Sequence, residues 1–186
     1  GLANFLAGTG ISIYYRHRAN QVGGKVSVRE EKKSTLILRS IGGLFLWLAV
    51  IAYLINPAWL AWSSLGFPAW LRWTGAGIGA VSVGLIYWVF SSLGLNVTPT
   101  VVTREQSHLV THGPYRWVRH PLYSVGVLSF VGYFLLTSSW VILLGVLLTV
   151  PFLILRTPQE EERLIARFGD EYLQYMRRTG RYLPKF

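Results

Sequence analysis

The sequence predicts an all-α integral membrane protein with about five membrane helices and a C-terminal cytosolic helical lid. Of its 186 residues, 52% are hydrophobic and only 14% are charged, whereas soluble domains typically contain about 25% charged residues. The mean hydropathy is +0.38. Long apolar runs alternate with polar segments that hold nearly all the Lys and Arg residues, which is typical of membrane helices and their loops. We expect a single membrane domain over 1–186.

Five apolar segments account for the expected membrane helices. Residues 1–15 are short for a span of about 20 residues, so they predict a partial or interfacial first helix. Membrane helices are expected at 36–55 and 70–90, and a helical hairpin at 122–136 and 140–155 with a tight turn between its arms. At 1.5 Å per residue, each arm covers only about 22–24 Å of the hydrocarbon core of the bilayer, which is about 30 Å thick. The mouth of the hairpin should therefore lie at or below the lipid headgroups.

Small residues recur in the helix expected at 70–90. The pairs Gly75 with Gly79 and Ala80 with Gly84 are each four residues apart, and this spacing of small residues lets two helices approach closely in lipid. A dinucleotide-binding fingerprint at 75–79 is disfavoured, because no strand precedes it and its third glycine is misplaced. Close helix packing is the prediction here.

The charge distribution predicts the topology. The formal net charge is +10, and the bases gather at 16–39, 104–119 and 156–185. The positive-inside rule places the polar segments 16–34 and 96–120 and the C-terminal tail, and with them the candidate active site, on the cytoplasmic side of a multi-pass protein. A nucleic-acid partner is not expected, because the basic segments alternate with segments of bilayer length. The chain has no cysteine, which excludes thiolate metal sites, and no metal is expected. We expect no cleavable signal, because the apolar start precedes its positive charges.

The C-terminal residues 157–180 predict amphipathic cytosolic helices that form the lid. Thr157, Pro158 and Glu160 match a capping box, which predicts that a new helix starts after the second hairpin arm. Gly169 is expected to end this helix and Asp170 to cap a second, shorter one.

Turn formers, aromatic residues, bases and histidine are concentrated at 112–123. Pro121 predicts the start of a helix. A proline has no backbone N–H group, and at the first helical position that group would have no partner within the helix. The free N–H groups expected from Leu122 to Ser124 would favour an anion such as a carboxylate. This stretch and the one around Arg156 and Glu160 flank one hairpin, so its adjacent ends should bring them together at one membrane face.

An ordered set of motifs over 108–184 resembles the isoprenylcysteine carboxyl methyltransferase family and its prokaryotic integral membrane relatives. The motifs are Gly113-Pro114-Tyr115, Arg119-His120-Pro121-x-Tyr123, Arg156, Glu160-Glu161, Leu164, Phe168-Gly169-x-Glu171-Tyr172-x-x-Tyr175 and Leu183-Pro184. The resemblance implies an S-adenosylmethionine-dependent methyltransferase that releases S-adenosylhomocysteine, with 108–184 as its cofactor region.

Site roles follow from the same resemblance. It implies that Arg156 orients the methyl acceptor, and that Glu161 is the register alternative to Glu160. The loop length before Gly113 can differ by a residue from the family pattern, so His108 is the loosest assignment. The residues implied to bind the cofactor are His108, Leu109, Val110, Tyr115, His120, Pro121, Leu122, Tyr123 and Glu160.

The expected acceptor is a small lipophilic molecule, which can be an isoprenoid, a fatty molecule or a phospholipid, taken from the bilayer at the membrane–cytosol interface. Carboxyl O-methylation is the expected reaction. Two alternatives stay open. A membrane sterol-type reductase with a nicotinamide cofactor shares an Arg-His-Pro-x-Tyr-like stretch, and a non-enzymatic lipid-binding membrane protein would also have a basic cytoplasmic face.

Overall fold

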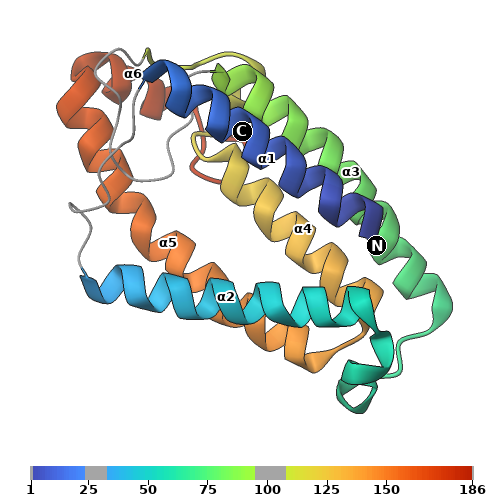
Figure 1. Ribbon diagram of the computed structural model, residues 1–186. Coiled ribbons are helices and arrows are strands. Elements are labelled where there is room, and N and C mark those ends of the chain that lie inside the picture. Colours follow the sequence, from blue (N-terminus) through green and yellow to red (C-terminus); the bar gives the residue numbers. More distant parts are fainter. Residues whose placement is uncertain (1, 24–32, 95–107, 186) are drawn as a thin grey trace.

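A computed structural model describes residues 2–23, 33–94 and 108–185, and these residues fold into helices joined by short connections (Figure 1). The prediction of an all-α membrane protein is confirmed. In chain order the helices are α1 (Leu2–Gly23), α2 (Lys33–Ile55), the 3-10 helix η2 (Pro57–Ser63), α3 (Ala69–Leu93), the 3-10 helix η4 (Gly113–Arg116), α4 (Pro121–Thr137), α5 (Trp140–Phe168) and α6 (Asp170–Arg178).

The helices differ in their ability to cross a bilayer. Within the described ranges, α3 and α5 are long and apolar enough to span it, and residues 41–55 of α2 together with η2 pass the same test as a pair bent by 119°. The 17 residues of α4 form a shorter apolar helix. By length and composition the described residues thus contain two spans, or three with the bent pair, where the sequence predicted about five membrane helices. The first helix runs on to Gly23 and includes Arg16 and Arg18, so it is longer and more polar than the predicted 1–15.

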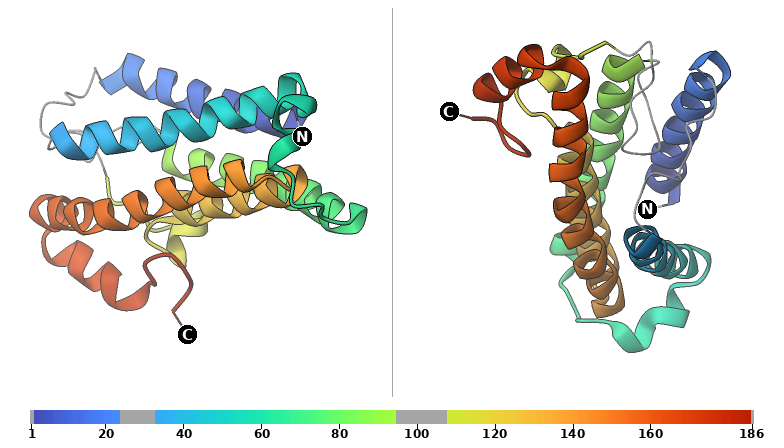
Figure 2. Two further views of the ribbon diagram at one scale, coloured as in Figure 1. Left: turned by 90° about the horizontal axis from the view of Figure 1, so that it is seen from below. Right: turned by 90° about the vertical axis from the view of Figure 1, so that its left-hand side faces the viewer.

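Glycines set the close approach of α3 and α4. A Cβ atom added at Gly75 would lie 2.5 Å from the backbone nitrogen of Leu136 and 2.7 Å from the carbonyl oxygen of Gly132. One added at Gly132 would lie 3.1 Å from the nitrogen of Gly79. The predicted close contact is therefore confirmed at Gly75 and Gly79, whereas a Cβ atom at Gly84 would meet nothing within 4 Å. In addition, α1 packs against α3, and α2 against α5 (Figure 2).

A two-residue turn joins α4 to α5, as the hairpin prediction requires. The Ser139 hydroxyl accepts a hydrogen bond from the Ile142 backbone nitrogen at 3.4 Å, which caps α5. The same hydroxyl lies 2.6 Å from the Ser63 hydroxyl, and the Leu65 backbone nitrogen donates to the Ser138 carbonyl at 2.6 Å. These contacts fix the closed end of the hairpin against η2.

The predicted helix start at Thr157 is wrong, because α5 is continuous over 29 residues through Pro151 and Pro158. A capping Thr157 hydroxyl would accept from the start of a new helix, but it donates to the Leu153 carbonyl at 2.8 Å, a bond of a helix interior. Pro158 removes one helical N–H group without ending the helix. The predicted end at Gly169 is confirmed by its φ of 55°. The N-cap of α6 is Gly169 and Asp170 is its first helical residue, so the prediction that Asp170 caps this helix is wrong by one position.

The α3–α4 contact makes a prediction about stability. Gly75→Ala should lower the free energy of unfolding by about 1–3 kcal/mol, because the added methyl group meets the α4 backbone. The matched control is Gly77→Ala on the same helix, where a Cβ atom meets nothing within 4 Å and the lower chain entropy should leave stability equal or higher. Thermal unfolding in detergent micelles measures both, and equal losses in the two variants would contradict the packing argument.

Candidate active site

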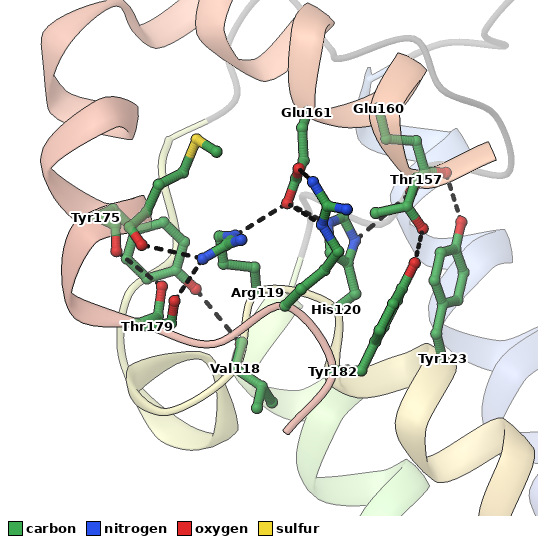
Figure 3. A network of polar contacts seen from close by, with 12 residues as sticks. Val118, Arg119, His120, Tyr123, Thr157, Glu160, Glu161, Tyr175, Thr179 and Tyr182 are labelled. Atoms are coloured by element: carbon green, nitrogen blue, oxygen red, sulfur yellow. Dashed lines mark hydrogen bonds and ion pairs between the residues drawn. The ribbon is translucent and has the colours of Figure 1, made fainter. Parts of the chain in front are cut away.

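Three segments that are distant in sequence meet at one end of the bundle. They are the residues leading into α4, the second half of α5 and the segment 179–184 that follows α6, which we call the C-terminal strap (Figure 3). Backbone hydrogen bonds hold the strap beside the start of α4: Arg119 donates to the Gly180 carbonyl at 2.9 Å and His120 to the Arg181 carbonyl at 3.0 Å. The hairpin mouth is therefore closed on one side by the C-terminus.

The helix predicted to begin at Pro121 does begin there, with His120 as its N-cap. The predicted row of free N–H groups is wrong, however. The backbone nitrogens of Tyr123 and Ser124 both donate to the His120 carbonyl, at 3.1 and 3.3 Å. The anion-binding argument from this helix end fails for those two groups, and charged side chains dominate the site instead.

Glu160 is the first of two carboxylates at the site. Its Oε1 atom accepts a hydrogen bond from the Tyr123 hydroxyl at 2.5 Å and lies 2.8 Å from the Arg156 Nε atom, one helical turn earlier on α5. Its Oε2 atom lies 3.6 Å from the His120 Nδ1 atom. The His120 and Tyr123 rings stack with centroids 5.5 Å apart. The structure thus brings together four of the predicted site residues, and both hairpin arms contribute.

Glu161 is the second carboxylate, and it binds a different set of partners. Its Oε1 atom lies 2.9 Å from the Arg119 Nε atom and 3.4 Å from the His120 Nε2 atom, and Oε2 pairs with Arg181 of the strap. Hydrogen bonding to Glu161 raises the pKa of Arg181 above its ordinary value, so this arginine stays charged. The Arg119 guanidinium also donates to the Thr179 and Met176 carbonyls at the end of α6. Glu161 is therefore the point that joins α4, α5, α6 and the strap.

Hydroxyl groups complete the attachment of the C-terminal region. The Tyr182 hydroxyl donates to the Thr157 hydroxyl at 2.6 Å, and the Ser124 hydroxyl donates to the Tyr182 carbonyl at 2.5 Å. From α6, the Tyr175 hydroxyl donates to the Tyr115 carbonyl at 2.6 Å. Burial raises the pKa of Tyr175 above its ordinary value, so this phenol is neutral and remains a donor.

The other residues implied for cofactor binding lie outside this ion-pair cluster. Val110, Tyr115 and Leu122 belong to an apolar cluster with Val89 and Val125. Pro121 is buried at the start of α4, whereas His108 is exposed and Leu109 is half-buried in the segment before η4.

Sequence reasoning missed the roles of Arg119, Thr157, Arg181 and Tyr182. Arg119 belongs to the Arg119-His120-Pro121-x-Tyr123 motif but receives no role from the sequence, and Thr157 is predicted only as a helix cap. Arg181 and Tyr182 directly precede the Leu183-Pro184 motif, and this neighbourhood was the one signal that could have found them. Their partners are 20 or more residues away in sequence, so no local pattern reveals the pairing.

An apolar cavity of about 270 Å³ adjoins the Glu160 group between α4 and α5. We call it the α4–α5 cavity. Tyr123, whose hydroxyl contacts Glu160, forms part of its wall. The rest of the wall comes from Ser124, Val127, Val150, Leu153, Ile154, Tyr182 and Leu183. The Glu160 group and the apolar cavity therefore meet at Tyr123.

The Glu161 pairs make a prediction about stability. Glu161→Gln should lower the free energy of unfolding by about 3 kcal/mol, because it leaves the largely buried Arg119 without its counter-charge. The strap should also exchange its backbone hydrogens faster. The control is Glu162→Gln, an exposed neighbour on the same helix, for which we expect a change within about 0.5 kcal/mol. Hydrogen exchange and thermal unfolding in micelles test both, and an unchanged strap in Glu161→Gln would contradict the role given to this carboxylate.

Parts of the chain are similar in sequence to a metal-resistance protein and to isoprenylcysteine methyltransferases. The chain is 32% identical over 82 residues to the cobalt-zinc-cadmium resistance protein CzcN of Cupriavidus metallidurans, covering 44% of this chain and 38% of that protein. It is 38% identical over 99 residues to the protein-S-isoprenylcysteine O-methyltransferase of Homo sapiens, covering 45% of this chain and 31% of that enzyme. The Mus musculus enzyme is 41% identical over 95 residues. The matched part of the chain thus spans less than two fifths of the length of each of these three relatives.

The family match is wider. The sequence profile described as phospholipid methyltransferase matches residues 70–171, which is more than half of the chain and includes α3, α4 and α5 with both carboxylates. Together with the isoprenylcysteine methyltransferase relatives, it confirms the resemblance found in the sequence. The chain belongs to the phospholipid methyltransferase family, which includes isoprenylcysteine methyltransferases.

Proposed function

We propose that the protein is an S-adenosylmethionine-dependent methyltransferase that methylates a small lipophilic acceptor at the membrane–cytosol interface. The acceptor is an isoprenoid, a fatty molecule or a phospholipid that enters from the bilayer, and carboxyl O-methylation is the proposed reaction. The reaction type is supported by relatives whose names describe O-methylation of isoprenylcysteine. S-adenosylhomocysteine is the product left by the cofactor.

One observation carries the proposal: Tyr123 both binds Glu160 and lines the α4–α5 cavity. A methyl transfer to a lipid needs a polar site for the cofactor beside an apolar site for the acceptor chain. The two hairpin arms supply a polar site and an apolar site, and the side chain of Tyr123 borders both. Among the residues that form the cavity wall, Leu153 lies on α5 three residues before Arg156.

The residues present fit the proposed cofactor. S-adenosylmethionine combines a sulfonium and an ammonium group with a carboxylate and an adenosine. The cluster offers the Glu160 carboxylate for the cationic groups and the stacked His120 and Tyr123 rings beside it. Three arginines against two glutamates leave a net positive charge for an anionic group. Glu160 is the more accessible carboxylate, since its side chain is 16% exposed and that of Glu161 is 4%.

The proposed chemistry asks for alignment more than for acid or base catalysis. When bound, the cofactor supplies an activated methyl group whose transfer is a direct in-line displacement. Tyr123 and Arg156 hold the Glu160 carboxylate from two sides, which fixes a binding group for the cofactor. Arg156 orients an anionic acceptor by charge-assisted hydrogen bonding. Because Glu160 already balances the Arg156 charge, the acceptor is oriented without being fully neutralised and keeps its nucleophilicity.

We propose that this site faces the cytoplasm. Arg116 and Arg119 precede α4, and Arg156 and Arg181 belong to the segments that meet them. Bases gathered at one end of a membrane bundle are typical of the cytoplasmic side.

Cofactor binding makes the first functional prediction. Glu160→Gln and Tyr123→Phe should each weaken S-adenosylhomocysteine binding about 10-fold or more, because hydrogen bonds to charged groups contribute about 1.5–3 kcal/mol. Isothermal calorimetry in micelles measures the affinity. The matched controls are Glu162→Gln and Tyr87→Phe, both on exposed side chains, which should bind like the unmodified protein.

The outcomes of that calorimetry separate the candidate functions. Unchanged binding in Glu160→Gln, in a protein that unfolds at the normal temperature, would contradict the site. Binding of a nicotinamide cofactor in place of S-adenosylhomocysteine would favour the reductase, and binding of neither would favour a non-enzymatic lipid-binding protein.

Arg156 makes the second functional prediction. Arg156→Lys keeps a positive charge near Glu160 but loses the planar geometry for a carboxylate, so it should raise KM for the acceptor about 10-fold. Cofactor affinity should change less than threefold. Transfer of a labelled methyl group to lipid extracts, followed by kinetics on the accepted lipid, provides the measurement. A loss of cofactor binding that exceeds the change in KM would assign Arg156 to the cofactor side instead.

A further inference from the structure

A second and larger apolar cavity lies between α3 and α4, and we call it the α3–α4 cavity. Its volume is about 680 Å³, within the range of about 300–1,000 Å³ typical of small-molecule sites. It shares Ser124, Tyr182 and Leu183 with the α4–α5 cavity, so the two cavities adjoin at these residues. None of His120, Arg156 and Glu160 is among its lining residues. Of the residues implied to bind the cofactor, Pro121 alone lines this cavity, so the cavity is separate from the Glu160 ion-pair cluster.

The cavity extends from the helix ends into the apolar part of the bundle. Its deepest contributions are Leu85, eight residues before the end of α3, and Leu128, seven residues after the start of α4. At 1.5 Å per residue these distances correspond to about 10–12 Å along the helices. The cavity thus reaches a depth that corresponds to the acyl-chain region of one leaflet, below its headgroups.

The wall is open to the surroundings of the protein. Trp88 and Trp117 are 40% and 43% exposed and meet edge to face with ring centroids 5.7 Å apart. Leu183 of the strap is 76% exposed. In a bilayer this wall faces hydrocarbon. If the cavity were empty, the side chains that line it would lose dispersion contacts. An acyl chain is the chemical match for this surface.

The rim carries a group suited to an anionic headgroup. The Arg116 guanidinium carbon lies 4.6 Å from the Trp117 ring centroid, and the side chain is exposed. The contact with the ring holds the charge beside the cavity mouth. Tryptophan and arginine at this depth are typical of the headgroup level of a membrane.

We propose that the α3–α4 cavity binds one anionic phospholipid of the bilayer, with an acyl chain between α3 and α4 and its phosphate at Arg116. The chain packs against Tyr182 and Leu183, so the bound lipid supports the strap from the side opposite the active site. This binding site goes beyond the proposed methyl transfer, and it requires neither the cofactor nor the acceptor.

Native mass spectrometry of the full chain tests the site. The protein is released from micelles that contain equal amounts of dioleoyl phosphatidylglycerol and dioleoyl phosphatidylcholine, with no cofactor present. We expect one retained phosphatidylglycerol per chain. Leu85→Trp should fill the cavity and lower the retained lipid at least fivefold, whereas Leu147→Trp should retain it, because Leu147 is an exposed residue of α5 outside the cavity.

Arg116→Gln tests the headgroup contact. A base at the membrane surface contributes about 1 kcal/mol toward an anionic lipid, so this variant should lose about fivefold in the preference for phosphatidylglycerol over phosphatidylcholine. Arg178→Gln, an exposed arginine of α6, should keep the preference. Thermal unfolding identifies variants that do not fold, and Leu128→Phe replaces Leu85→Trp if that variant fails.

Three results would overturn the proposal. One is an unmodified protein that retains no lipid, and another is equal retention by the Leu85→Trp and Leu147→Trp variants. The third is a dimer mass that disappears in Leu85→Trp, which would assign the cavity to a second copy of the chain. Because lipid retention is measured without cofactor, a failure here is distinguishable from a failure of the methyltransferase proposal.

Discussion

The structure of the site depends on the buried ion pair between Arg119 and Glu161. The two side chains are 9% and 4% exposed, and one guanidinium reaches both the carboxylate on α5 and the carbonyls at the end of α6. A buried charge of this kind is costly unless it is paired and hydrogen-bonded. The pair therefore commits α4, α5 and α6 to one arrangement, and Arg181 adds the strap to the same carboxylate.

The adjacent glutamates divide the work of the site. Glu161 is engaged by two arginines and a histidine, and it organises the fold around the hairpin mouth. Glu160 has a tyrosine and one arginine as its closest partners and is the more exposed of the two. Consecutive positions on a helix point about 100° apart, which is why neighbours in sequence contact different elements. The two glutamates that the sequence left as register alternatives therefore have two different sets of contacts in the structure.

Much of the fold was predictable because its signals are local. Pro121 at a helix start and Gly169 at a helix end each act through their own backbone, and the structure agrees with both. The error at Thr157 has a physical cause. A capping pattern shows that a helix can start at Thr157, but here the Thr157 hydroxyl bonds to Leu153 in the preceding turn and to Tyr182 of the strap. The convergence of Tyr123 and Glu160 was predictable from the hairpin, because two arms joined by a short turn must end side by side. The pairing of Arg181 with Glu161 was not, since nothing local specifies where the strap folds back.

The continuity of α5 has a mechanical consequence. Its 29 residues extend about 43 Å at 1.5 Å per residue, so this helix is longer than the hydrocarbon layer and carries Arg156 and Glu160 in its second half. Helices adjust to bilayer thickness by tilting. A change in lipid thickness that tilts this helix also shifts the height of Glu160 relative to the headgroups, so the depth of this carboxylate depends on the surrounding membrane as well as on the chain.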